Sequence, residues 1–244
     1  MSHRYRFIGA ETAPGLWLLD ADEALHLAKV LRLSVGTAVE VTDGAGAWAL
    51  GTVAAVAGKS ATIAGETTQV EAPPAWRLQV CVGALRPGLL DEILPGLTEL
   101  GVDAIHVFQQ QDNAKARLAD KAVERWQRII VQAIKQCKRA RLPSLQVHGS
   151  VRELVAALAA DTAQRVLLDP VAGESLWGVL GAGVAPAGLL LALGGEKGFS
   201  ADEEASLRQA GFRPAALGRY VLRAITAALS ASSIAAAARE AAAR

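Results

Sequence analysis

Two segments near the C-terminus combine glycine-rich backbone with a predicted helix start, a combination typical of small-molecule sites. They are LLLALGGEKGFSADEEASL at 189–207 and LGRYVLRAITAAL at 217–229. Because glycine has no side chain, a ligand can approach its backbone closely and meet free N–H and C=O groups. Such a loop at the carboxyl end of a strand is where open α/β sheets bind their ligands.

The loop of the first segment, GGEKGFS, indicates what kind of ligand it could hold. It has neither the spacing of a phosphate-binding P-loop nor that of a dinucleotide fingerprint. It also carries Glu196 in its middle, where the carboxylate would repel a phosphate. A cationic or zwitterionic ligand therefore suits this loop better than an anionic one.

Local patterns predict the elements that position this loop. The apolar run 189–193 predicts a buried strand, which the following glycines end. The Ser200 side chain can accept a hydrogen bond from the first helical turn while Glu203 bonds back to Ser200, so a capping box is expected to start a helix. The Ala-rich tail from Val221 to Arg244 predicts a long helix.

The pair Pro73–Pro74 separates two patterns, and we predict a domain boundary there. Residues 1–72 are expected to form a small PUA-like β-barrel that binds RNA, with a short helix over 21–31. Its predicted strands are WLLD, AVEVTD, WALGTVAAV and SATI. Residues 73–244 are expected to form an α/β domain with a parallel sheet. Its predicted strands are RLQVCVGAL, AIHVF, RVLLDP and GLLLAL.

Cysteine usage and hydropathy exclude several classes of protein. Cys81 and Cys137 have no spacing typical of a disulfide framework or a zinc site, so no metal is expected. No basic leader and no apolar stretch of about 18 residues is present, so we expect neither secretion nor a membrane span. A reducing, cytoplasmic location is the simplest prediction.

The two glycine segments are joined by further stretches that resemble one family. These are TELGVDAI at 98–105, RWQRIIVQAIKQCKRARLPSL at 125–145 and HLAKVLRLSVGTAVEVTDGAG at 26–46. Together they resemble the SPOUT-class methyltransferases that methylate N3 of a uridine in 16S ribosomal RNA. The resemblance covers nearly the whole chain, in the same order and at the same spacings.

This resemblance implies a deep trefoil knot in the second domain, S-adenosylmethionine as the cofactor, and a homodimer that acts on 16S ribosomal RNA or the small ribosomal subunit. The knot is expected only from the family likeness, since knots are otherwise essentially absent from proteins. Three loops, at 168–170, 193–198 and 217–222, would hold the cofactor. The implied cofactor-binding residues are Leu168, Leu193, Gly194, Gly195, Glu196, Gly198, Leu217, Gly218, Tyr220 and Leu222. The alanines of the last helix, Ala224, Ala227, Ala228 and Ala231, would permit close packing against a partner.

Two residues are candidates for catalytic roles under this resemblance. Uracil N3 carries a proton, so some group must accept that proton or stabilise the uracil anion. Arg223, beside the cofactor loop, would stabilise the anion, although it could instead cap a helix or lie in an interface. Glu196 would order the amino group of the cofactor or act as a base, although it could instead serve the loop's own hydrogen bonds.

Several positions depart from the family pattern. Lys197, Tyr220 and Ile225 replace a glycine, an arginine and a glutamate of the two motifs. Gln111, Asp112 and Lys135 replace other charged or polar positions expected near the substrate. Three hypotheses therefore stand: methylation of a 16S uridine at N3, methylation of another RNA target, and a non-catalytic RNA-binding protein that retains the fold.

A basic stripe is the main candidate for RNA contact. Six basic and no acidic residues lie over 125–141, and on a helix Arg125, Arg128, Lys135 and Arg139 follow a face beside the apolar one. Either this face meets phosphate or it is an ordinary solvated surface. Arg4 and Arg6 flank Tyr5, and Lys29 and Arg32 lie at the turn VLRL. These residues could clamp unpaired RNA, or lie on an ordinary barrel surface. The predicted RNA-binding residues are Arg4, Arg6, Lys29, Arg32, Arg125, Arg128, Arg139 and Arg141. His26 could be a general base but is more typical of a structural residue.

Overall fold

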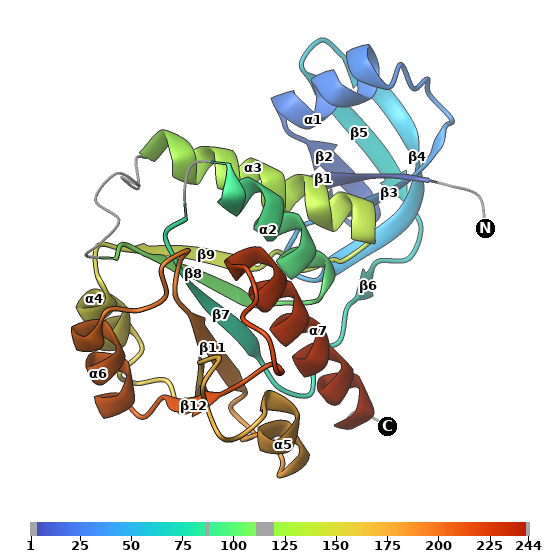
Figure 1. The fold of residues 1–244 in the computed structure, drawn as a ribbon. Coiled ribbons are helices and arrows are strands. Elements are labelled where there is room, and N and C mark those ends of the chain that lie inside the picture. The colour runs from blue at the N-terminus through green and yellow to red at the C-terminus, as the bar shows by residue number, and fades with distance from the viewer. Residues whose placement is uncertain (1–3, 86–87, 111–119, 243–244) are drawn as a thin grey trace. The chain divides into compact units, whose positions relative to one another are not determined.

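The chain forms two compact units in a computed structural model that describes residues 4–85, 88–110 and 120–242. The first unit contains residues 1–72 together with 131–142, and the second contains 73–130 and 143–244. The boundary predicted from the sequence places 131–142 in the second domain. A division along the sequence cannot foresee this segment because its contacts are made with residues about a hundred positions earlier. Figure 1 shows both units.

The first unit is a small barrel. Its strands pair in the order β3, β1, β2, β5, β4, and β3 also pairs with β4, so five strands close on themselves while β6 extends β4. The pairs are antiparallel except that β1 and β3 are parallel. The predicted β-barrel is therefore confirmed. The elements are β1 (Tyr5–Ala13), β2 (Leu16–Leu19), α1 (Ala21–Leu25), the π-helix η1 (His26–Val30), β3 (Ala38–Thr42), β4 (Ala47–Ala57), β5 (Ser60–Gly65) and β6 (Gln69–Val70).

The short helix predicted over 21–31 is present as α1 followed by η1. Its start is fixed locally, because the Asp20 side chain accepts a hydrogen bond from the N–H of Glu23 at 2.8 Å. The core of this unit contains Phe7, Trp17 and Leu27, each fully buried. The sequence analysis did not predict β1, in which Phe7 lies.

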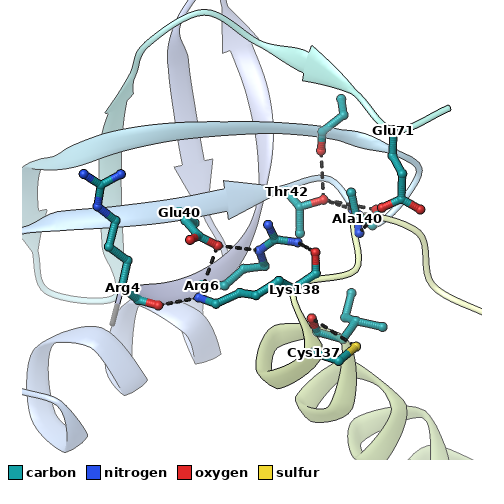
Figure 2. Close-up of polar contacts among 11 residues, drawn as sticks. Arg4, Arg6, Glu40, Thr42, Glu71, Cys137, Lys138 and Ala140 are labelled. Carbon is teal, nitrogen blue, oxygen red and sulfur yellow. Dashed lines mark hydrogen bonds and ion pairs between the residues drawn. The ribbon is translucent and has the colours of Figure 1, made fainter. Parts of the chain in front are cut away.

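The segment 131–142 closes one side of this barrel. The hydroxyl of Thr42 donates to the carbonyl of Ala140 at 3.1 Å, and the N–H of Ala140 donates to Glu71 at 2.6 Å. Lys138 has a left-handed backbone with φ of 64° and ends the preceding helix. Its carbonyl accepts from Arg6 and its ammonium lies 3.1 Å from Glu40, as Figure 2 shows. These contacts hold an uncommon backbone conformation in place.

The second unit is built on a parallel six-stranded sheet in the order β12, β10, β11, β7, β8, β9. The α/β architecture with a parallel sheet that the sequence predicted is confirmed. Its elements are β7 (Leu78–Gly83), α2 (Leu89–Glu99), β8 (Ala104–Phe108), α3 (Asp120–Cys137), β9 (Ser144–His148), α4 (Val151–Ala157), β10 (Gln164–Leu168), α5 (Leu176–Gly181), β11 (Leu189–Leu193), α6 (Ala201–Gln209), β12 (Arg213–Ala215) and α7 (Ala224–Ala242). The first part of α3 belongs to this unit and the rest to the barrel.

Helices cover both faces of this sheet, as Figure 1 shows. On β7 the alternate residues Leu78, Val80 and Val82 pack with α2, α5 and α7. Cys81, between them, packs with α4 and α6 on the other face. A strand buried on both faces reads as a continuous apolar run, which is why β11 was predicted from its sequence LLLAL.

Helix α7 begins at Ala224, three residues after the predicted start, and its packing corrects one expectation. Ala228 and Ala231 are 0% and 1% exposed because they pack in the core of their own chain. They are not available to a partner subunit. The close approach of α2 and α7 depends on Gly96, where a Cβ atom would lie 2.6 Å from the side chain of Leu229.

Candidate active site

A cavity of about 760 Å³ lies at the carboxyl ends of β10 and β11 and beside the segment that joins β12 to α7. The sequence predicted three loops around a cofactor, and residues from all three line this one cavity. They include every predicted cofactor-binding residue: Leu168, Leu193, Gly194, Gly195, Glu196, Gly198, Leu217, Gly218, Tyr220 and Leu222. Arg223, the other predicted catalytic residue, lines it as well.

The glycine loop after β11 folds back on itself. The N–H of Gly198 donates to the carbonyl of Gly195 at 3.0 Å, so Glu196 and Lys197 occupy the tip of a β-turn. Gly198 has φ of 74°, a left-handed conformation that favours glycine. A Cβ atom on Gly194 would lie 2.5 Å from the backbone of Gly198. Gly194 is thus required by the loop's own shape, whatever ligand the loop holds.

The helix that follows this loop begins as predicted. Ser200 accepts a hydrogen bond from the N–H of Glu203 at 3.3 Å, and Glu203 accepts one from the N–H of Ser200 at 2.9 Å. The capping box is therefore confirmed. Glu203 is only 5% exposed, so its carboxylate also serves as a buried acceptor beneath the loop.

Gln110, which was not among the residues predicted from the sequence, bonds to both ends of the turn in the glycine loop. Its carboxamide oxygen accepts from the N–H of Gly195 at 2.7 Å, and its nitrogen donates to the carbonyl of Gly198 at 2.9 Å. The same nitrogen lies 3.2 Å from Glu203. No local pattern could reveal these contacts, because the partners lie more than eighty residues along the chain.

The predicted loop 217–222 is anchored just before its start and exposed beyond it. The N–H of Leu176 donates to the carbonyl of Ala216 at 2.8 Å, which ties the loop to the start of α5. Tyr220 is 73% exposed, and the guanidinium of Arg219 lies 5.7 Å from its ring centre. A Cβ atom on Gly218 would meet no protein atom within 4 Å. A side chain at Gly218 would therefore occupy free space at the cavity wall without disturbing the fold.

The cavity brings charged groups of both signs together. Glu92, Asp169 and Glu196 contribute carboxylates, and Lys197 and Arg223 contribute cations. Asp169 accepts from the N–H of Val171 at 3.0 Å and lies 3.5 Å from the guanidinium of Arg208, so it also orders its loop. Glu92, on the first turn of α2, was not predicted, because only its place in the fold brings it to this cavity.

The predicted RNA-binding residues of the barrel differ in how they are placed. Arg6 is 6% exposed and bonds to Glu40 at 3.0 Å, so it lies inside the unit and not on an RNA-facing surface. Arg141 donates to the carbonyls of Ala45 and Glu71, and so holds the segment 131–142 to the barrel. Lys29 and Arg32 are exposed, and Arg4 is half-buried.

The basic face predicted on α3 is only partly exposed. Arg125 and Arg128 are exposed, and Arg125 pairs with Asp91 at 2.5 Å. Lys135 departs from the prediction, because it is 8% exposed and its ammonium lies 2.6 Å from Glu23. Arg139 is half-buried in the segment after the helix.

Other predicted features are placed as follows. Trp126, Ile130 and Ala133 are buried, which confirms the apolar face of α3. The ring of His26 lies edge-on to Phe7 with centres 6.5 Å apart, a packing contact within the barrel. Gln111 and Asp112 lie outside the described residues.

A buried chain of polar residues crosses the second unit away from the cavity. Gln79 donates from its side-chain nitrogen to Asp161 at 2.7 Å, and its oxygen lies 3.2 Å from Nε2 of His106. The Nδ1 atom of His106 lies 3.2 Å from Nε2 of His148. Because Asp161 can only accept, Gln79 must accept from His106, and His106 must then accept from His148.

The described part of the chain has neither a metal-binding cluster nor a helix able to span a membrane. There, no cluster of three or more His, Cys, Asp or Glu side chains is arranged to bind a metal ion. None of the helices in residues 4–85, 88–110 and 120–242 combines the length and apolarity needed to cross a membrane.

Comparisons with protein families place both parts of the chain. An RNA methyltransferase domain family matches residues 72–236, and an RNA methyltransferase PUA domain family matches residues 19–64. Among curated proteins, the chain is 31% identical over 216 residues to ribosomal RNA small subunit methyltransferase E of Mycobacterium bovis. That alignment covers 86% of this chain and 82% of the relative.

Solved structures share the fold over almost the entire chain. A Legionella pneumophila protein crystallised with the cofactor SAM superposes with a TM-score of 0.84 at 22% identity, covering 97% of this chain and 98% of that one. A ribosomal RNA small subunit methyltransferase E from Neisseria gonorrhoeae, bound to S-adenosyl methionine, superposes with a TM-score of 0.82 at 23% identity. The coverage there is 95% of this chain and 96% of that one.

Proposed function

Because this chain belongs to the RNA methyltransferase family, we propose that it transfers the methyl group of S-adenosylmethionine to N3 of a uridine in 16S ribosomal RNA. The observation that carries this proposal is that residues of all three predicted loops line one cavity. Relatives named as ribosomal RNA small subunit methyltransferase E support the substrate class. Two solved neighbours with that cofactor bound support its identity.

The residues that line the cavity fit this cofactor. A volume of about 760 Å³ lies in the range of pockets that hold ligands of this size. Leu168, Leu193 and Leu222 offer apolar contact for an adenine ring, and the glycine turn offers backbone groups. Glu196 supplies a carboxylate for a positively charged amino group. When bound, the cofactor would supply an activated methyl group attached to a sulfonium cation.

The chain's own residues would then position the acceptor and manage its proton. Much of the rate of such a transfer comes from holding the two reacting atoms in line. Arg223, exposed at the cavity wall, would stabilise the negative charge of a uracil that has lost its N3 proton. Glu196, and Glu92 from α2, are the carboxylates that we propose as candidate proton acceptors.

We further propose a division of labour between the domains, with 1–72 binding RNA and 73–244 binding the cofactor and forming a homodimer. The exposed residues Lys29, Arg32 and Arg128 support RNA contact by the surfaces that bear them. Trp177 is 68% exposed and Val221 is 81% exposed, and in the proposed homodimer the partner subunit would cover them. A monomer mass by light scattering would contradict the homodimer. The trefoil knot and the cytoplasmic location belong to the same proposal.

The test is a methylation assay on small ribosomal subunits with labelled S-adenosylmethionine, followed by mass-spectrometric mapping of the modified base. We expect one methyl group on N3 of a uridine in 16S ribosomal RNA. Arg223→Ala should lower kcat by about a hundredfold, as loss of one charge-stabilising group typically does, and leave cofactor affinity unchanged. Methyl transfer to a different nucleotide would exclude the N3 proposal, and cofactor binding without transfer to any RNA would exclude the enzyme.

A further inference from the structure

Gln110 contacts the turn that lines the cavity although it does not itself line that cavity. Gly195 and Gly198 form an isolated antiparallel bridge, so the N–H of Gly195 and the carbonyl of Gly198 lie on the two arms of the turn. The side-chain amide of Gln110 bonds to both, at 2.7 Å and 2.9 Å. It thus bridges the two arms of the turn and satisfies one backbone donor and one backbone acceptor.

The surroundings of this amide are shaped for it. A Cβ atom on Gly83, at the end of β7, would lie 2.3 Å from the carboxamide oxygen of Gln110. A Cβ atom on Gly195 would lie 2.6 Å from the same oxygen. Gln110 itself is 5% exposed, so its polar atoms bond to these protein groups and have little contact with water. Two glycines therefore leave space that one buried amide fills.

The amide is also oriented from its other side. The carboxylate of Glu203 lies 3.2 Å from the Gln110 nitrogen and can only accept a hydrogen bond when ionised. The nitrogen of Gln110 must therefore face Glu203 and Gly198, and its oxygen must face Gly195. The capping box fixes Glu203 in turn, through the N–H of Ser200 at 2.9 Å.

We propose that Gln110 is a positioning residue for the cofactor loop, and that its donation to the Gly198 carbonyl sets the turn that presents Glu196 and Lys197 to the cavity. This inference rests on the proposed function, since it takes the loop to bind S-adenosylmethionine. Gln110 acts through the loop and makes no contact with the reacting atoms. Losing its amide removes the donor to the Gly198 carbonyl and with it the side-chain link between the two arms of the turn.

The experiment compares the intact protein with Gln110→Glu, Glu203→Gln and the double variant that combines the two substitutions. In Gln110→Glu alone, two carboxylates face each other and the donor to Gly198 is lost. In the double variant only one carboxylate remains, so the repulsion is removed, and the oxygen of the introduced carboxamide still accepts from the N–H of Ser200, which keeps the capping box. The donor to the Gly198 carbonyl is missing in both proteins that carry Gln110→Glu, which separates folding from loop positioning.

Calorimetry would give the Kd for S-adenosylmethionine and thermal unfolding the Tm of each protein. At about pH 8 we expect Glu203→Gln to bind as the unsubstituted chain does, and both proteins that carry Gln110→Glu to bind about tenfold more weakly. The double variant should recover the Tm of Glu203→Gln but not its affinity. Near pH 6, protonation of the introduced carboxylate, favoured by burial, should restore a donor to Gly198 and with it the affinity of the double variant. In Gln110→Glu alone the proton would be shared with the facing carboxylate of Glu203, so the Gly198 carbonyl would stay without its donor.

The possible outcomes distinguish failure of the inference from failure of the proposed function. If the double variant binds as tightly as Glu203→Gln at about pH 8, the Gly198 hydrogen bond is unnecessary and the inference is overturned while the proposed function stands. If the unsubstituted chain does not bind the cofactor at all, the proposed function fails and takes the inference with it. A double variant with native Tm, weak binding and recovery on acidification supports the inference.

Discussion

His106 makes the stability of the second unit depend on pH in a way that can be calculated. Burial lowers its pKa from 6.5 to about 4, and the neighbouring His148 adds to this effect. The electrostatic influence of Asp161 acts in the opposite direction, and that of Arg77 lowers the pKa further. At neutral pH the ring is therefore uncharged, as its hydrogen bonds to Gln79 and His148 require.

The direction of the effect follows from proton binding. In the unfolded chain a histidine has a pKa of about 6.5 and gains a proton as the pH falls through that value. In the folded chain His106 stays neutral down to about pH 4. The unfolded state thus binds more protons between these values, so the stability contribution is complete above 6.5 and decreases as the pH falls toward 4.

The magnitude follows from the same two pKa values. Between about pH 7.5 and about pH 5, this single group should lower the free energy of unfolding by about 2 kcal/mol. Burial also lowers the pKa of His148, partly opposed by Glu153, so His148 acts in the same direction. Burial alone would raise the pKa of Asp161, but hydrogen bonds from Gln79 and Ala163 and two nearby arginines lower it overall. The stabilising contribution of Asp161 is therefore complete above about pH 4 and is lost only below it, outside this interval.

The measurement is urea unfolding of the intact protein and of His106→Gln at several pH values between about 5 and 7.5. Glutamine keeps one donor and one acceptor but cannot take up a proton in this range. The difference in free energy between the two proteins should shrink by about 2 kcal/mol across the interval. An NMR titration of the histidine ring protons gives the pKa directly. Parallel pH profiles, or a His106 pKa near 6.5, would refute this account.

Three further outcomes are expected from other parts of the chain. Lys135→Met should destabilise the barrel by about 3–5 kcal/mol because it leaves Glu23 buried without its cation, and adding Glu23→Gln should recover much of that loss in a thermal unfolding assay. Arg128→Ala should reduce the slope of log K for RNA binding against log salt concentration by about 0.7 to 0.9, because one phosphate contact is lost. Lys59→Ala, at an exposed turn, is the control, and an equal decrease there would show that no specific contact is lost. Gly218→Val should weaken S-adenosylmethionine binding by about tenfold or more with an unchanged Tm, since its side chain meets only free space; unchanged affinity would remove this loop from the site.

Local patterns predicted the parts of the structure whose cause is local. The continuous apolar run of β11 and the capping box at Ser200 and Glu203 are readable within a few residues, and both are confirmed. Strand β1 was missed because Arg6 interrupts its pattern. That arginine is tolerated only because Glu40, thirty-four residues later, lies beside it.

Buried charged and polar groups explain most of the remaining differences. Lys135 was expected on a face that either meets phosphate or is solvated, but its partner Glu23 is distant in sequence and nearby only in the fold. The same holds for Gln110 and the glycine loop. Sequence shows that a polar residue is present, whereas its burial depends on a partner that only the tertiary structure supplies.

The distribution of motif departures around the cavity bears on which function this chain retains. The loop that lines it is shaped by backbone groups, by the turn between Gly195 and Gly198, and by the buried amide of Gln110. The replaced positions, Lys197, Tyr220 and Ile225, also line the cavity, but they contribute side chains and not the turn itself. A site formed by backbone tolerates changes of side chain better than one built from charged side chains does. We therefore expect cofactor binding to persist in this chain, and any change in function to affect which RNA is methylated and how its proton is removed.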